Sequence, residues 1–167
     1  MEFRKSAIKD IDEIMKIISE AKLYFKKNNI NQWQDGYPDK DVILNDVKNE
    51  ESFVVINDNK VIGTVVISFK GEKTYNKIYE GTWLSNNDYT VIHRIAISNE
   101  FKGFGIGTMI IEEAQKLAFE KNIRSIKIDT HKDNISMQKL LIKNNFKYCG
   151  VIYLEDRSER VAFEKLF

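Results

Sequence analysis

Three glycines occur at every second position of one segment, directly before a stretch with helical periodicity. They are Gly103, Gly105 and Gly107, and the periodic stretch runs on to about Lys121. Glycine destabilises a helix interior, so this spacing indicates a backbone that a ligand must approach closely. The N–H groups of a first helical turn bind anions, and Lys102 adds a positive charge beside them. The segment predicts a phosphate-binding loop, with a glycine-rich turn that binds nothing as the alternative.

Two common phosphate-binding patterns do not fit this loop. A P-loop requires Gly-Lys followed by Ser or Thr, whereas Gly107 is followed by Thr108 and Met109. A dinucleotide-binding fingerprint requires a third glycine, and its place is taken by Thr108 or by Ile110, depending on the starting glycine. Asp129 lies about twenty residues further on, where a ribose-binding acid is expected, so a nucleotide-dependent enzyme stays a weaker alternative.

His93 is the first candidate for a general base. Imidazole changes its charge near neutral pH, which suits a group that must take a proton from a nucleophile. The segment Tyr89–Ser98 alternates as a strand does, so His93 is expected on the same face as Ile95 and Ile97. The alternative is a histidine that bonds a neighbour and only packs.

Cys149 is the only cysteine of the chain. It has no partner for an internal disulfide, and a metal site of clustered cysteines is excluded. No His-Asp arrangement accompanies it, so we interpret Cys149 as a small buried apolar residue and expect no metal.

The elements that must position these residues follow from hydrophobic periodicity. Strands are expected at 2–7, 52–56, 61–69, 89–98, 125–131, 147–154 and 160–167, and helices from Ile11, after Pro38, at 105–121 and at 135–145. Asp10 is expected to cap the first helix, and residues 57–60 to form a hairpin turn. A loop with a short strand near Ile78 precedes the fourth strand. This order predicts a mixed α/β sheet with helices on both faces, in one domain over residues 1–167.

Composition limits the partners and the compartment. The chain has 167 residues, 43% of them hydrophobic and 31% charged, with a formal net charge of +1. A long polyanion is therefore not expected as a partner, which argues against nucleic-acid binding. The charged N-terminus lacks the apolar core of a signal peptide, and no apolar run is long enough to span a membrane. We expect a cytoplasmic protein with no membrane partner.

Two segments together resemble the GNAT family of N-acetyltransferases. Residues 102–107 match the family pattern R/Q-x-x-G-x-G/A, with Lys102 in the place of Arg or Gln. The pattern N-x-x-A-x-x-L-Y-x-x-x-G-F follows the next strand of the family. In this chain Asn134, Leu140 and Phe146 match it, whereas Met137, Leu141 and Asn145 replace the alanine, the tyrosine and the glycine. The resemblance extends in element order from Phe3 to the C-terminus.

The resemblance implies a GNAT-type mixed, mostly antiparallel sheet whose central parallel fourth and fifth strands splay apart. In that family acetyl-CoA is the co-substrate, and its pantetheine arm lies between these two strands. The implied cofactor-binding residues are Ile95, Ala96, Ile97, Lys102, Gly103, Phe104, Gly105, Ile106, Gly107, Thr108 and Asn134. No metal is implied.

The implied reaction is direct transfer of the acetyl group to a primary amine. The N–H of Ile97 would hold the developing oxyanion, and His93 would take the proton of the amine. The tyrosine that protonates the leaving thiolate in the family is replaced by Leu141. Tyr148, Tyr153 or water could substitute. The replacement also motivates an alternative function, a non-catalytic module that binds or senses acyl-CoA.

The resemblance indicates the residues of the acceptor site less specifically than those of the cofactor site. Trp33 and Trp83 lie in the two segments that wall this site in the family, with plain packing as the alternative. Asp129 and His131 follow one strand face and could line the same site, or the carboxylate could cap the next helix. Asp35 or Glu80 could attract a cationic amine. The acceptor is a small-molecule amine or a protein or peptide amine, and the family also allows a homodimer.

Overall fold

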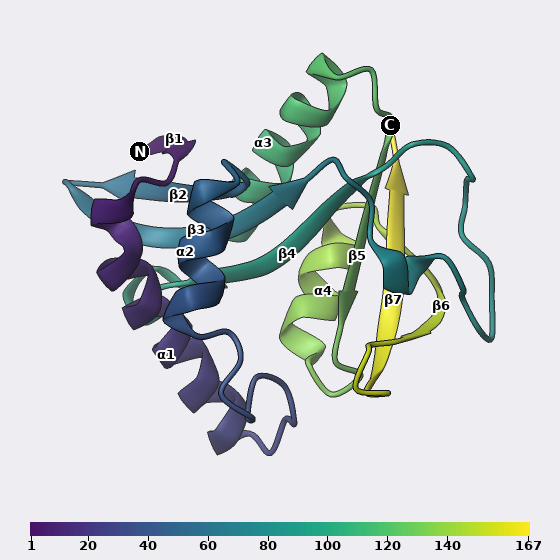
Figure 1. The fold of residues 1–167 in the computed structure, drawn as a ribbon, viewed down its shortest axis with the longest axis horizontal. Helices are drawn as coiled ribbons and strands as arrows, with labels where there is room; N and C mark the ends of the chain where they lie inside the picture. The colour runs from purple at the N-terminus through teal and green to yellow at the C-terminus, as the bar shows by residue number, and fades with distance from the viewer. The chain divides into compact units, whose positions relative to one another are not determined.

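The order of strands and helices along the chain follows the order predicted from the sequence (Figure 1). The computed structural model describes residues 1–167. The strands are β1 (Glu2–Lys5), β2 (Ser52–Asn57), β3 (Lys60–Ser68), β4 (Thr90–Ile97), β5 (Ser125–Thr130), β6 (Lys147–Tyr153) and β7 (Glu159–Leu166). The α-helices are α1 (Ile11–Lys27), α2 (Lys40–Lys48), α3 (Ile106–Glu120) and α4 (Ile135–Lys143), with short 3-10 helices η1 (Ile8–Asp10), η2 (Lys73–Tyr75) and η3 (Asn99–Phe101). Predicted and observed boundaries differ by only a few residues.

The seven strands form one mixed sheet in the order β1-β2-β3-β4-β5-β7-β6. Pairing is antiparallel between β1 and β2, β2 and β3, β5 and β7, and β6 and β7. The β4–β5 pair is parallel, in register at Thr90–Ile126 and Val91–Lys127. The predicted mixed, mostly antiparallel α/β sheet is therefore confirmed.

The chain divides into two compact units. Unit 1 comprises Met1–Ile67 and His93–Glu113, and unit 2 comprises Ser68–Ile92 and Ala114–Phe167. Unit 1 holds the glycine segment, the second part of β4 and Trp33. Unit 2 holds Asp129, Asn134 and Trp83.

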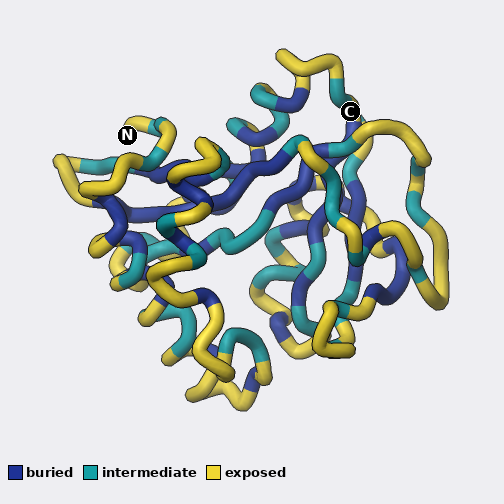
Figure 2. Tube along the Cα trace, viewed as in Figure 1, coloured by how far each residue is buried: buried dark blue, intermediate teal, exposed yellow.

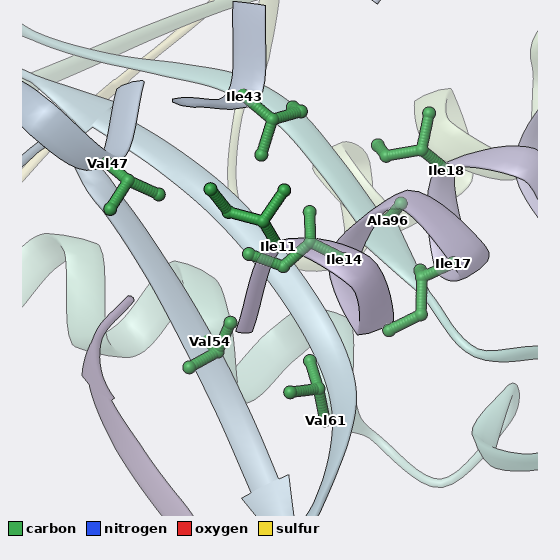
Figure 3. Packing of buried hydrophobic residues seen from close by; sticks show 9 residues of the cluster. All are labelled: Ile11, Ile14, Ile17, Ile18, Ile43, Val47, Val54, Val61 and Ala96. Atoms are coloured by element: carbon green, nitrogen blue, oxygen red, sulfur yellow. The ribbon is translucent and has the colours of Figure 1, made fainter. Parts of the chain in front are cut away.

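The core of unit 1 joins α1 and α2 to the strands. Figure 3 shows the cluster at close range, and Figure 1 shows the two helices that contribute to it. Its members are Ile11, Ile14, Ile17 and Ile18 of α1, Ile43 and Val47 of α2, Val54 of β2, Val61 of β3 and Ala96 of β4. Strands β2 and β3 are buried along most of their length (Figure 2). Each fully buried isoleucine contributes roughly 1.5–3 kcal/mol, so this cluster anchors β4 through Ala96.

Asp10 takes a different role from the predicted one. It stands directly before α1, but its carboxylate caps no N–H of that helix. Asp10 closes the 3-10 turn η1 and already has helical backbone angles, whereas a capping residue is usually extended. Its carboxylate accepts the N–H of Ala7 at 2.7 Å and pairs with both terminal nitrogens of Arg4, at 2.8 and 3.0 Å. Arg4 thereby lowers the pKa of Asp10.

Unit 2 closes with the predicted hairpin of β6 and β7. The loop before β4 holds a single bridge, Tyr79 to Val151, in place of the predicted short strand near Ile78. The buried Glu164 of β7 fixes the same loop, because its carboxylate accepts the N–H of Leu84 at 2.6 Å and the hydroxyl of Ser85 at 2.9 Å. These bonds hold the part of the loop around residues 84–85, which belongs to no helix or strand.

No helix of the structure combines the length and the apolar character that crossing a membrane would require.

Candidate functional site

Residues 102–105 of the glycine segment form an exposed loop in unit 1 between η3 and α3, whereas Gly107 is buried in the first turn of α3. Gly103 and Gly105 have φ angles of +83° and +80°, in the left-handed region that other residues avoid. A Cβ atom built on either glycine would meet no other atom within 4 Å. Phe104, between them, is 71% exposed. The backbone of the loop is therefore open to a molecule from outside.

The start of α3, which follows the loop, is fixed by a backbone hydrogen bond and by packing against β3. Met109 donates its N–H to the carbonyl of Gly105 at 3.0 Å, the first α-helical bond of α3. The first N–H groups of any α-helix have no acceptor in a preceding turn of the same helix. Ile106 is 2% exposed and packs over Gly63 of β3, where an added Cβ would come within 3.3 Å of it. The positive end of α3 is thus held in place directly behind the loop.

The entrance to the loop is tied to β3 and to α1. Ser98 donates its N–H to the carbonyl of Ile62 at 2.9 Å, and Asn99 donates its N–H to the carboxylate of Glu20 at 2.7 Å. The exposed Lys102 places its Nζ 4.5 Å from the ring centre of Tyr24. This cation–π contact keeps a positive charge at the entrance of the loop.

Strand β4 leads to the loop and contains a backbone irregularity. Arg94 has a φ angle of +49°, which is unusual for a residue with a side chain. The left-handed residue Arg94 lies between His93 and Ile95 and interrupts the alternation of the strand. Alternation alone therefore no longer places His93 on the same face as Ile95 and Ile97, as was predicted. Beyond the turn, Ala96 is buried against the core of unit 1, and Ile95 and Ile97 are half-buried.

A buried ion pair beside His93 was not predicted from the sequence. The guanidinium of Arg94 donates to both carboxylate oxygens of Asp46, at 2.6 and 2.8 Å, and to the hydroxyl of Tyr37. Burial raises the pKa of Asp46, against the lowering effect of Arg94 and of the nearby His93. The available signal was that Asp46 lies three residues after Ile43 and next to Val47, on the apolar side of α2.

In unit 2 Asp129 accepts a hydrogen bond from a buried phenol. The hydroxyl of Tyr75 donates to its carboxylate at 2.6 Å. Burial, and then the charge of Asp129, raise the pKa of Tyr75 well above its ordinary value. The next helix is capped by Asn134, whose side chain accepts the N–H of Met137 at 3.2 Å. The contact of Asp129 with Tyr75 thus differs from the helix-capping alternative.

The two tryptophans have packed surroundings. Trp33 lies edge-on to Phe25, with ring centres 5.6 Å apart, and contacts the core of unit 1. Trp83 donates its indole N–H to the carbonyl of Tyr75 at 2.9 Å, and its ring centre lies 4.3 Å from the ammonium nitrogen of Lys127. Both rings are half-buried, so packing is established for each of them and a binding role stays a prediction.

The position of the family tyrosine is part of the hydrophobic interior. Leu141 is 0% exposed. Tyr148 and Tyr153 are exposed and make ring contacts with Phe163 and Tyr79. Asn145, which replaces the family glycine, has left-handed backbone with a φ angle of +66°, a conformation that asparagine tolerates better than most residues.

The remaining candidates are Cys149, His131, Asp35 and Glu80. Cys149 is a buried free thiol, as predicted, and burial raises its pKa. His131 accepts the N–H of Asp133 at 3.1 Å, and burial lowers its pKa. Asp35 and Glu80 are exposed. No group of three or more His, Cys, Asp or Glu side chains is placed to hold a metal ion.

Comparison with known proteins identifies relatives over most of the chain. Residues 12–146 match the family model described as the acetyltransferase (GNAT) family. A GNAT-family acetyltransferase of known structure from Streptococcus agalactiae is 35% identical, with a TM-score of 0.90 over 99% of this chain and 95% of that chain. The PaiA N-acetyltransferase of Thermoplasma acidophilum, solved in complex with coenzyme A, shares the fold at 18% identity, with a TM-score of 0.74 over 99% of this chain and 98% of that chain.

A curated relative is the streptothricin acetyltransferase of Escherichia coli, which is 25% identical over 114 residues. The match covers 67% of this chain and 57% of that protein, so this chain spans little more than half the length of the relative.

Proposed function

Because the chain belongs to the acetyltransferase (GNAT) family, we propose that it transfers an acetyl group from acetyl-CoA directly to a primary amine. The observation that carries the proposal is the loop of Gly103 and Gly105 before α3. Two left-handed glycines with open space in front of them offer their backbone to an anion, and the start of a helix adds its positive end. The diphosphate of coenzyme A is an anion of this kind.

Lys102 and the residues up to Thr108 would bind that diphosphate. The list of proposed contacts is Lys102, Gly103, Phe104, Gly105, Ile106, Gly107 and Thr108 in the loop and helix start, Ile95, Ala96 and Ile97 in β4, and Asn134 at the start of α4. Acetyl-CoA, when bound, supplies an acetyl thioester that an amine can attack. The charge of Lys102 serves the diphosphate as a point charge, without the planar fork that arginine would bring.

The reaction itself is assigned to residues of β4. His93 would take a proton from the attacking amine, and the N–H of Ile97 would donate to the thioester oxygen as negative charge develops there. Asp46 and Arg94 keep charged groups beside His93, which makes its surroundings polar despite partial burial.

The acceptor is assigned to Trp33, Trp83 and Asp129. Aromatic rings and a carboxylate suit an amine that carries a positive charge before it reacts. A small-molecule amine and a protein or peptide amine both satisfy this chemistry, and the streptothricin acetyltransferase gives a reason to begin with small molecules. We place the reaction in a reducing compartment, the cytoplasm, because Cys149 is a free thiol.

A transfer assay tests the proposal. Release of the coenzyme A thiol would be followed with acetyl-CoA and a panel of polyamines, amino acids, streptothricin-type and aminoglycoside antibiotics, and peptides with free N-termini. We expect amine-dependent release with at least one class. The proposal is contradicted if no amine supports release and acetyl-CoA at millimolar concentration does not bind.

One observation favours a second candidate function, a non-catalytic module that binds acyl-CoA. Leu141 is buried where the family has its proton-donating tyrosine, and leucine has no proton to give. Tight binding of acetyl-CoA without turnover on any amine of the panel would support this candidate over the enzyme.

A further inference from the structure

Arg94 holds a backbone conformation that its residue type does not explain. Its φ angle is +49°, in the middle of strand β4. Left-handed backbone is unfavourable for an L-residue with a Cβ, and glycine, asparagine or aspartate usually occupies such positions. A residue of this kind inside a strand marks a bulge, which changes the direction of the strand beyond it. Something outside the backbone of Arg94 must therefore stabilise the turn.

The side chain of Arg94 supplies that stabilisation. Nε and Nη2 donate to Oδ2 and Oδ1 of Asp46 at 2.8 and 2.6 Å, and Nη1 donates to the hydroxyl of Tyr37 at 2.5 Å. The side chains of Arg94 and Asp46 are only 15% and 6% exposed, so water screens this pair little. A planar guanidinium bound at three nitrogens has a fixed orientation, which fixes the Cα that carries it.

Both partners of the guanidinium are themselves anchored. Asp46 lies on α2 between residues of the core, since Ile43 and Val47 are buried in the cluster of Figure 3. Tyr37 lies in the loop between α1 and α2, where Lys22 of α1 donates to the carbonyl of the next residue, Pro38, at 2.8 Å. The three-residue set Arg94, Asp46 and Tyr37, here called the guanidinium clamp, thus connects β4 to two other segments of unit 1.

We propose that Arg94 is a positioning residue, whose guanidinium clamp maintains the left-handed turn in β4 and so sets the direction of the N–H and C=O groups of Ile95–Ile97. The inference rests on the proposed function, in which these backbone groups bind acetyl-CoA. If the turn relaxed to an extended conformation, the residues beyond it would face the opposite sides of the sheet. The groups of Ile95–Ile97 would then no longer present the same donors and acceptors.

Two substitutions at the same position separate the backbone effect from the loss of the ion pair. Arg94→Ala and Arg94→Gly remove the guanidinium equally and leave Asp46 equally unpaired. They differ in that glycine adopts left-handed backbone as readily as right-handed, whereas alanine does not. If alanine weakens acetyl-CoA binding more than glycine does, the extra loss is due to the backbone conformation at position 94.

The test is titration calorimetry of acetyl-CoA with the full chain, together with the melting temperature of each variant. We expect Arg94→Ala to weaken binding about tenfold or more and Arg94→Gly about threefold. Arg4→Ala is the matched control, because Arg4 also pairs through two nitrogens with an aspartate of unit 1, Asp10. It should lower the melting temperature and leave the Kd for acetyl-CoA at the wild-type value.

Each other result overturns the inference. Wild-type affinity in Arg94→Ala would show that the clamp does not position the binding groups, and equal losses in the alanine and glycine variants would assign the effect to the ion pair alone. Should Arg94→Ala fail to fold, Tyr37→Phe keeps the ion pair and removes one bond, and an unchanged Kd in that variant also overturns the inference. Absence of acetyl-CoA binding by the wild-type chain would contradict the proposed function instead.

Discussion

His93 is the residue on which the proposed chemistry depends most directly. It is half-buried in β4, next to the left-handed Arg94 and close to the carboxylate of Asp46. His93→Ala should lower kcat about 10²–10⁴-fold, the range for loss of a general base. The Kd for acetyl-CoA should stay unchanged, because His93 is not among the residues proposed to bind acetyl-CoA.

The other histidine provides the control for that measurement. His131→Ala removes an imidazole from unit 2 and should keep kcat within about threefold of the wild type, with any effect confined to the KM of the amine. Steady-state kinetics of both variants check the assignment. A His93→Ala enzyme with normal kcat would remove the base from the proposed mechanism.

The hydrogen bond between Tyr75 and Asp129 gives a pH-dependent prediction. The pKa of Tyr75 is raised in the folded state, so the phenol stabilises the fold fully below the ordinary tyrosine pKa of about 10 and loses this contribution as the pH rises further. Tyr75→Phe should be less stable than the wild type at pH 7, and the difference should shrink above about pH 10. Thermal unfolding of both proteins between pH 7 and 11 measures it, and a constant difference across that range would contradict the assignment.

At the level of single residues, the sequence predicted the environment of a residue better than its side-chain contacts. The buried thiol of Cys149 followed from residue type. The bond from Tyr75 to Asp129 did not, since the two residues are 54 positions apart and Tyr75 lies in a segment without a clear pattern. Asp46 is likewise a polar residue whose partner, Arg94, is 48 positions away.

Helix α4 offers a test at the level of elements. Its start is fixed by the side chain of Asn134, which accepts the N–H of Met137. Asn134→Ala should lower the free energy of unfolding by about 1 kcal/mol, and Asn134→Ser should restore most of it, because serine also caps. Chemical unfolding of the three proteins provides the values, and an alanine variant as stable as the wild type would show that this cap contributes little.

The same pair of variants separates capping from the proposed contact with acetyl-CoA. If Asn134 contacts the co-substrate, a serine variant with restored stability still binds acetyl-CoA more weakly than the wild type.

Elements with regular periodicity were predicted closely, whereas irregular ones were not. The isoleucines of α1 follow one helical period, and β2 and β3 are continuous runs rich in β-branched residues. The predicted start of α1 and the predicted bounds of both strands agree with the structure to within one residue. Apart from η2, the loop before β4 has only the isolated Tyr79–Val151 bridge, and contacts such as those of Glu164 with Leu84 and Ser85 fix its path. The turn at Arg94 was not foreseen, since arginine gives no local sign of left-handed backbone.

For the whole molecule, the order of elements and two short motifs were sufficient to predict the family. The glycine motif follows β4 and ends in the first turn of α3, and the asparagine motif begins α4, as the resemblance implied. The acceptor amine did not follow from the sequence, because the aromatic and acidic side chains assigned to it also have ordinary packing contacts. The proposed amine site consists of side chains, whereas the proposed coenzyme site consists mainly of the backbone of a glycine loop, and a glycine motif indicates a loop of that kind.

The most direct test of the central claim is calorimetric titration of coenzyme A into the wild type, Gly105→Ala and Gly71→Ala. Both glycines have left-handed backbone, with φ angles of +80° and +77°, so alanine strains each position similarly. Only the Cβ at position 105 would enter the open space in front of the loop. The account predicts binding at least about tenfold weaker in Gly105→Ala and unchanged in Gly71→Ala. Equal affinity of Gly105→Ala and the wild type would contradict a coenzyme A site at this loop.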